Sequence, residues 1–424
     1  MPPGFAPFSH LSQELIDEII DVLLETEESR WITSQFCPSA LVCRAFRHRS
    51  QKHAFYSVRP FSHRDSLASS RKRVDDFHGI LQQNPRIASY VRRLKLDMND
   101  TNRWLFDDPL FCDIMELVSR TWAVGMRLEL SVFGWGGNFQ FTNNRRVETR
   151  FLKPFITPFI TSLDLYSTYN IPLSLLAHCP HLVELKLALV TVEAIRPPNA
   201  IDIDHSLCPR PRKFTFESCG DSIRILATGY VDFGYLQHLS VSGCLSDELG
   251  DVDLILIASS SSLDHLHLDF RKPGDGLDLY DLGKAPNLGF LSISEICLVD
   301  EGSLIELCNL LRTIFSEKSN IKRIALEFMG DLDDEYSLAE FLGGLETSGP
   351  LCVVLIKLAE REPLVVEFRL DISLQCEEFS PEEMWERRNK EMRVWSAKNL
   401  ELVSLLSSNL CLSHYLYSPV FNPQ

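Results

Sequence analysis

The sequence predicts an α/β protein in which a small N-terminal helical module precedes a curved solenoid with a parallel sheet. Three observations support this prediction: two apolar helical stripes near the N-terminus, a short apolar pattern that recurs from residue 91 onward, and a length of 424 residues. A chain of this length contains ample material for a core without disulfide or metal staples. Hydrophobic residues make up 45% and charged ones 24%, which excludes collagen-like and wholly disordered classes.

The cysteines and the N-terminus predict a reducing compartment. Residues 1–5 lack the charged-then-apolar pattern of a secretory signal, and no apolar run approaches the roughly 18 residues of a membrane helix. We therefore expect a cytoplasmic or nuclear protein without a membrane partner. The 12 cysteines include no C-x-x-C pair, which argues against zinc ribbons and fingers. Reduced and mostly buried thiols are expected.

Charge is segregated along the chain although the net value is -16. Residues 1–29 carry -7, residues 30–95 carry +11, and the remainder carries -20. The acidic average argues against nucleic acid as a partner, and no base-reading module accompanies the basic stretch. A basic stretch behind an acidic helix suits docking on an acidic protein, whereas the ordinary alternative is a solvated helix face.

Two helices are expected before the repeats. Leu15, Ile19 and Leu23 recur at helical spacing over residues 12–25, and Ser12 is placed to cap the first turn. Pro38 opens a second apolar set that runs into a basic segment ending near residue 56.

The paired motifs of these helices resemble the F-box, a short three-helix module. The resemblance covers roughly residues 8–57, with Ser12 where the family usually has Pro and Phe46 where Trp is commoner. It implies a surface for the Skp-type linker subunit of a cullin-based ubiquitin ligase. The residues that would form this linker-binding surface are Leu11, Glu14, Leu15, Ile19, Leu23, Leu41, Val42 and Phe46. The alternative is that the stripes form only a small helical core.

An apolar-x-x-apolar-x-apolar pattern recurs along most of the remaining chain, as in the strands of leucine-rich repeats. Clear copies end at Leu96, Leu165, Leu187, Val241, Leu268, Ile293 and Leu326, and weaker copies end at Leu130, Phe216 and Leu370. Cys219 and Cys244 stand at the next ladder position, where such repeats place Asn or Cys. Helices are expected between strands at 173–179 and 304–315. Stacking of these units would bury their apolar faces in a curved solenoid.

Alternation along each strand predicts which side chains face away from the core. If the motif leucines point inward, the intervening residues point outward, and aligned strands place His238, His265 and Phe290 in one cross-strand row. We expect this face to bind a target protein. Its residues are Glu184, Lys186, His238, His265, His267, Asp269, Phe290 and Arg323.

The histidines of this face raise the alternative of a metal or catalytic cluster. His238, His265, His267 and Asp269 are suitable ligand types for iron or zinc. Successive residues on one face of a strand are nearly 7 Å apart, an awkward spread for one ion, so a polar recognition face is favoured and no metal is expected.

Four segments follow from these patterns: an F-box-like domain over 1–60, a linker or helical connector over 61–89, a repeat domain over 90–375, and a capping helix with a tail over 376–424. A loop at residues 134–138 is expected to follow a strand at 124–130, and Ser380 with Pro381 opens the capping helix.

The expected function is a substrate-recognition adaptor of a ubiquitin ligase that performs no bond chemistry and needs no cofactor. The helical module would bind the linker subunit, and the repeats would hold a target protein. A scaffold that acts independently of any ligase, with the helices packed on the solenoid as a cap, is the alternative.

Overall fold

The computed structural model describes the chain from residue 12 to residue 415 with gaps. The described residues are 12–18, 44–62, 65–123, 126–135, 139–141, 147–193, 208–228, 230–243, 249–269, 280–297, 301–314, 320–332, 351, 353–354, 357–358, 365–374 and 410–415. The chain divides into two compact units, unit 1 from Met1 to Leu182 and unit 2 from Val183 to Gln424.

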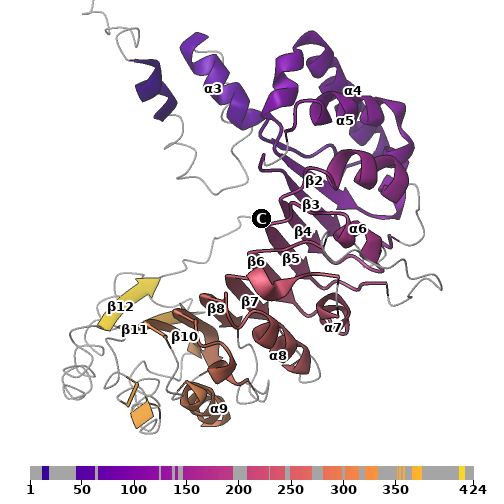
Figure 1. Ribbon diagram of the computed structural model, residues 1–424. Helices are drawn as coiled ribbons and strands as arrows, with labels where there is room; N and C mark the ends of the chain where they lie inside the picture. The colour runs from indigo at the N-terminus through magenta and orange to yellow at the C-terminus, as the bar shows by residue number, and fades with distance from the viewer. Residues whose placement is uncertain are drawn as a thin grey trace, which may run out of the picture. The chain divides into compact units, whose positions relative to one another are not determined.

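Unit 1 alternates helices with short strands (Figure 1). A helical segment at 13–18 comes first. The elements that follow are α3 (Arg44–Ala54), β1 (Ser57–Val58), α4 (Leu67–Gln83), η2 (Pro85–Tyr90), β2 (Arg93–Met98), η3 (Asp100–Asp107), α5 (Pro109–Ser119), β3 (Glu129–Gly134), the π-helix η4 (Val147–Ile156), β4 (Ser162–Tyr166) and α6 (Leu173–Ala177).

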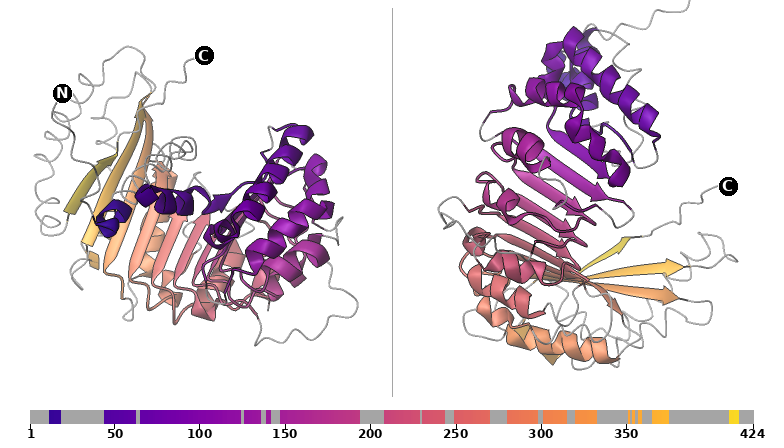
Figure 2. Two further views of the ribbon diagram at one scale, coloured as in Figure 1. Left: turned by 90° about the horizontal axis from the view of Figure 1, so that it is seen from above. Right: turned by 90° about the vertical axis from the view of Figure 1, so that its right-hand side faces the viewer.

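Unit 2 continues the alternation of strand and return segment. Its elements are β5 (Glu184–Ala188), β6 (Lys213–Glu217), α7 (Ser222–Ala227), η6 (Phe233–Tyr235), β7 (His238–Ser242), α8 (Leu249–Ala258), β8 (His265–Asp269), η8 (Leu282–Lys284), β9 (Phe290–Cys297), α9 (Glu301–Thr313), β10 (Arg323–Leu332), β11 (Val365–Leu374) and β12 (Leu410–Tyr415). Helices α7, α8 and α9 lie along one side of the strands (Figures 1 and 2).

Within each unit, every strand pairs in parallel with the next strand of the sequence. β1 to β4 pair consecutively in unit 1, and β5 to β12 do so in unit 2. A parallel sheet that grows by one strand per repeat, with helices in the returns, is a solenoid-like α/β arrangement. The predicted α/β class and parallel sheet are confirmed.

The register confirms most of the predicted repeat copies. Val241 lies opposite Leu268, and Leu268 lies opposite Ile293, as the shared motif position requires. Phe216, the end of a weaker copy, lies opposite Leu187 and is also correctly placed.

Two weaker copies were placed wrongly by two residues. Val132, not Leu130, lies opposite Leu96, and β3 occupies 129–134 rather than 124–130. Phe368, not Leu370, lies opposite Leu326. A shift of two residues preserves the face on which each side chain lies, so the alternation in these strands did not reveal the error.

A repeated backbone contact sets this register. The carbonyl oxygen just before one strand accepts hydrogen bonds from two successive N–H groups at the start of the next strand. Arg212 O accepts from Gln237 and His238 at 2.9 Å each, and Asp264 O accepts from Gly289 and Phe290 at 2.9 Å each. The same arrangement at Tyr56, Leu128, Val183 and Gln237 gives both units one construction.

The strand ends in unit 2 share a left-handed residue. Leu189, Ser218 and Gly243 directly follow β5, β6 and β7, with φ of 54°, 47° and 57°. Glu295 holds the equivalent position inside β9 with φ of 58°, next to the register shift between β9 and β10. The chain therefore leaves each of these strands by the same turn into its return segment.

The core lies beneath the motif positions. Leu163 and Leu165 in unit 1, like Leu291 and Ile293 in unit 2, have no accessible surface. Cys219 is buried and its thiol donates to the carbonyl oxygens of Leu187 and Glu217, which confirms the expected ladder role. The predicted helices at 173–179 and 304–315 correspond to α6 and α9.

The segment predicted as a linker or connector is helical and packed. Ser66 caps α4 by accepting from the N–H of Ser69, and Val74 and Leu81 of this helix are buried. The sheet already begins at β1, inside the range expected for the helical module. In the region expected to be a capping helix and tail, residues 376–409 lie outside the described residues, and β12 extends the sheet.

Among the described helices, none combines the length and the apolar character that crossing a membrane requires. The five cysteines with a described thiol form no disulfide with one another, and four of them are buried. Burial raises the pKa of Cys179 to about 12, so this thiol stays protonated at neutral pH.

Candidate recognition face of unit 2

The outward side chains of unit 2 form cross-strand rows, as the alternation predicts. The first row runs from Glu184 through Lys213, His238, His265 and Phe290 to Arg323, each residue being the register partner of the next. The second row runs from Lys186 through Thr215, Ser240, His267 and Ser292, and it ends at Ala325, which is buried. All eight predicted target-binding residues are half-buried or exposed, and the motif residues beside them are buried.

Rings stack along the first row. The imidazoles of His238 and His265 are nearly parallel, with centroids 4.3 Å apart and planes inclined by 17°. Phe290 meets His265 edge-on at 5.5 Å, and the guanidinium of Arg323 lies over the Phe290 ring at 5.0 Å. Adjacent parallel strands hold their side chains at close to this separation, so the stack follows from the register.

The electrostatic surroundings keep the His238 imidazole neutral at pH 7. Partial burial lowers the pKa of His238, and His265 and Lys213 lower it further, while Asp264 opposes the shift. The Asp264 Oδ2 atom lies 2.9 Å from Nδ1 of His265. His238 therefore contributes a neutral ring to this row at neutral pH and gains positive charge on acidification.

Ion pairs flank the ring stack at both ends. Lys186 Nζ lies 3.2 Å from Glu184 Oε1, and Arg323 lies 2.5 Å from Glu367 Oε1. The sequence reasoning did not select the partner Glu367, although the alternation along β11 already places it on the outward face of the sheet. With the observed register, Glu367 stands directly across from Ala325, one outward position beyond Arg323.

His267 and Asp269 follow His265 on the same face but do not join it in a metal site. Among the described residues, no three His, Cys, Asp or Glu side chains converge as ligands of one ion. His267 Nε2 instead lies 3.4 Å from the hydroxyl of Ser294. The arrangement offers rings, hydroxyls and charged ends along a sheet, which suits contact with a protein segment.

The predicted linker-binding residues are only partly described. Glu14 and Leu15 lie on the helical segment at 13–18, and Leu15 is 49% exposed. Ser12 caps this segment by accepting from the N–H of Leu15 at 3.4 Å, which confirms the expected cap, and Glu14 has a lowered pKa through hydrogen bonds to its own N–H and to Ser12. Phe46 lies on α3, and its side chain is not described. The remaining predicted linker-binding residues lie outside the described residues: Leu11, Ile19, Leu23, Leu41 and Val42.

One buried residue of this segment escaped the sequence reasoning. Ile16, next to Leu15, is buried at 3% exposure. The predicted stripe took Leu15 and omitted Ile16, although a helix with neighbouring apolar residues presents two overlapping stripes at helical spacing.

A scan against models of protein families finds no match to this chain, and a search of curated proteins finds no relative.

Proposed function

We propose that the protein is a substrate-recognition adaptor of a cullin-based ubiquitin ligase, with the N-terminal helices binding the Skp-type linker subunit and the outward rows of unit 2 binding a target protein. The observation that carries this proposal is the outward face itself. A row of rings with charged ends lies on a sheet whose described inward motif side chains are apolar and buried.

The mechanism is proximity. An adaptor that holds a target beside a ubiquitin-loaded enzyme raises the effective concentration of the target's lysines without forming or breaking bonds itself. His238, His265 and Phe290 provide flat, partly buried ring surface, which is the kind of surface that anchors protein contacts. Lys213 and Arg323 at the two ends of this row add orientation through charge.

Support for the linker interaction comes from the paired motifs and from the exposure of Leu15. A leucine that is 49% exposed on a capped helix is available to a partner. Helix α3 adds the exposed basic side chains Arg47 and Lys52, which suit an acidic partner.

The linker interaction is tested by mixing purified protein with purified Skp-type linker subunit. Leu15→Asp should abolish capture in a pull-down, because a carboxylate would be buried in the contact. Leu67→Asp is the matched control, since Leu67 on α4 is 47% exposed and lies outside the F-box-like motifs. Equal capture of both variants would refute the linker-binding surface.

A scaffold independent of any ligase is the second candidate. Two observations favour it: Ile16 is buried within the chain, and α3 packs on η2, where Arg86 contacts His48 at 2.8 Å. Helices that cover the solenoid in this way act as a cap. This candidate predicts that the wild-type protein captures no linker subunit at all, whereas the adaptor predicts a stable complex.

A further inference from the structure

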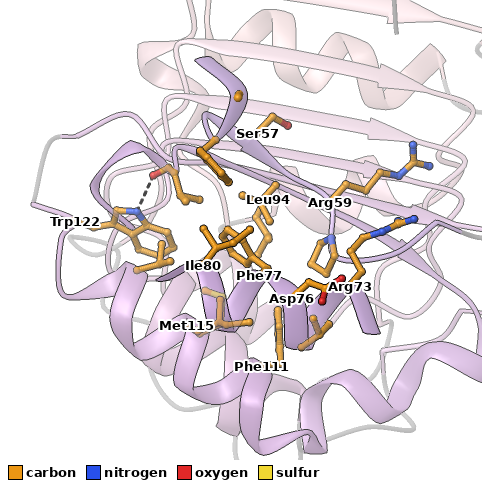
Figure 3. Close-up of a pocket in the computed structure, with 18 residues that line it drawn as sticks. Ser57, Arg59, Arg73, Asp76, Phe77, Ile80, Leu94, Phe111, Met115 and Trp122 are labelled. Carbon is orange, nitrogen blue, oxygen red and sulfur yellow. Dashed lines mark hydrogen bonds between the residues drawn. The ribbon is translucent and has the colours of Figure 1, made fainter. Parts of the chain in front are cut away.

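Unit 1 contains an apolar cavity of about 250 Å³ between α4, α5 and the first two strands (Figure 3). Its inner wall consists of buried residues: Leu94, Phe111, Ile114, Met115, Val118 and Trp122. At the surface side, Phe55, Val58, Phe77 and Ile80 line it with half-buried or exposed apolar side chains. The cavity is therefore open to solvent while its lining is apolar.

The shortness of β1 explains why this space is unfilled. β1 has only two residues and pairs with β2 only through Ser57 and Val58. A two-residue strand supplies one inward side chain, whereas the longer strands beyond it supply two or more. The face of α4 that carries Phe77 and Ile80 therefore lacks a full strand beneath it.

The charged residues that line the cavity are Arg59, Arg73 and Asp76, and each arginine is paired with a carboxylate from outside the lining. Arg59 pairs with Asp97, and Arg73 pairs with Asp65 at 2.8 Å. The Trp122 indole donates to the carbonyl oxygen of Val91 at 3.1 Å, as drawn in Figure 3. Since each arginine at the rim has a carboxylate partner, the rim offers no net positive charge to an anionic ligand such as a fatty acid.

We propose that this cavity binds a neutral, apolar small molecule about the size of two fused aromatic rings or a branched ten-carbon hydrocarbon. An apolar cavity of about 150 Å³ holds one benzene ring, so the larger volume here admits a second ring. Aromatic side chains on the wall, Phe111 and Trp122, favour a flat, unsaturated ligand. Among the described residues, none assigned to the linker-binding or target-binding surface lines this cavity.

The test uses the full-length protein and the neutral fluorescent probe 1-aminonaphthalene, which has two fused aromatic rings. The probe should bind one saturable site with a dissociation constant of about 1–10 µM, and naphthalene should displace it. Ala54→Phe, which fills the cavity at the end of α3, should weaken binding at least tenfold. Absence of saturable binding up to 100 µM probe, or displacement that fails, would overturn the proposal.

A second variant protects the test against misfolding of the first. Ile80→Lys places an ammonium group at the rim on a side chain that is 38% exposed, so the fold should tolerate it while probe affinity falls at least tenfold. Ile257→Lys is the matched control, since Ile257 on α8 of unit 2 is 54% exposed and should leave affinity unchanged. Equal affinities for Ile80→Lys and Ile257→Lys would place the probe elsewhere and refute the site.

Discussion

The two units use one backbone construction, and the outward contacts at its centre differ between them. In unit 1, side chains on β2 and β3 and just before β1 and β3 are tied to one another: Glu129 accepts from Arg93 and from Tyr56, and Arg127 lies 2.7 Å from it. In unit 2, His238, His265 and Phe290 stack as rings.

This contrast shows that the contacts that stabilise the sheet are separate from the side chains that the sheet exposes. Both units bury the same motif positions, and in both the carbonyl oxygen before one strand accepts hydrogen bonds from the start of the next strand. The outward residues are thus free to differ: an ion network in unit 1 satisfies its own charges, while a ring stack in unit 2 presents surface that suits a partner.

The largest expected effect concerns what the units share. Leu163→Ala in unit 1 and Leu266→Ala in unit 2 each remove a fully buried motif side chain and should each lower the free energy of unfolding by about 2–5 kcal/mol. Hydrogen exchange of peptides from β4 and β8 would report each loss locally. A loss in the free energy of unfolding below about 1 kcal/mol in only one unit would contradict a common construction.

The strand ends should respond unequally. A Cβ at Gly134 would lie 1.9 Å from the backbone oxygen of Ser167, so Gly134→Ala should cost about 2–4 kcal/mol. At Gly243 the Cβ would meet the movable hydroxyl of Ser218 at 2.9 Å with φ of 57°, and the cost should be about 1–2 kcal/mol. Thermal unfolding compares both with Gly250→Ala, where nothing lies within 4 Å and the variant should be at least as stable as the wild type.

Replacing one outward residue in each unit sharpens the comparison. Glu129→Gln leaves Arg93 and Arg127 without their carboxylate and should lower the free energy of unfolding of unit 1 by about 1–2 kcal/mol. The expected loss is small because Arg127 is exposed and solvent screens its ion pair. His238→Gln in the ring stack should change stability by less than about 0.5 kcal/mol. Urea unfolding followed by exchange at β3 and β7 measures both, and equal costs would mean that the faces do not differ.

The smallest effect is a pH dependence that originates at His238 in unit 2. Because the pKa of His238 is lowered in the folded state, the unfolded chain binds more protons below about pH 6.5, and stability falls as pH falls through that range. His238→Gln should reduce this acid sensitivity. Melting temperatures at pH 7.5 and pH 5 for both proteins provide the measurement, and identical slopes would contradict the assignment.

Sequence reasoning placed most strands because the recurring pattern fixes the frame: an apolar residue is followed, three and five residues later, by two apolar residues that point inward. It misplaced β3 because Leu128, Leu130 and Val132 are all apolar and alternate, so two frames fit the sequence equally well. The row of His238, His265 and Phe290 was predictable because aligning the motif positions of successive copies places these residues side by side. The left-handed residues after the strands and the cavity beside β1 were not, because they depend on turn geometry and on how short that strand is.

The carbonyl oxygen that precedes one strand and accepts from the start of the next has an evolutionary consequence. Because Arg212, Gln237 and Asp264 fix the following strand through main-chain atoms, their side chains are not required for the spacing of the rows. Insertions and deletions in the return segments can accumulate while the display stays aligned, and outward positions can be exchanged one at a time. Such a framework allows lineages to diversify their ligands without redesigning the scaffold.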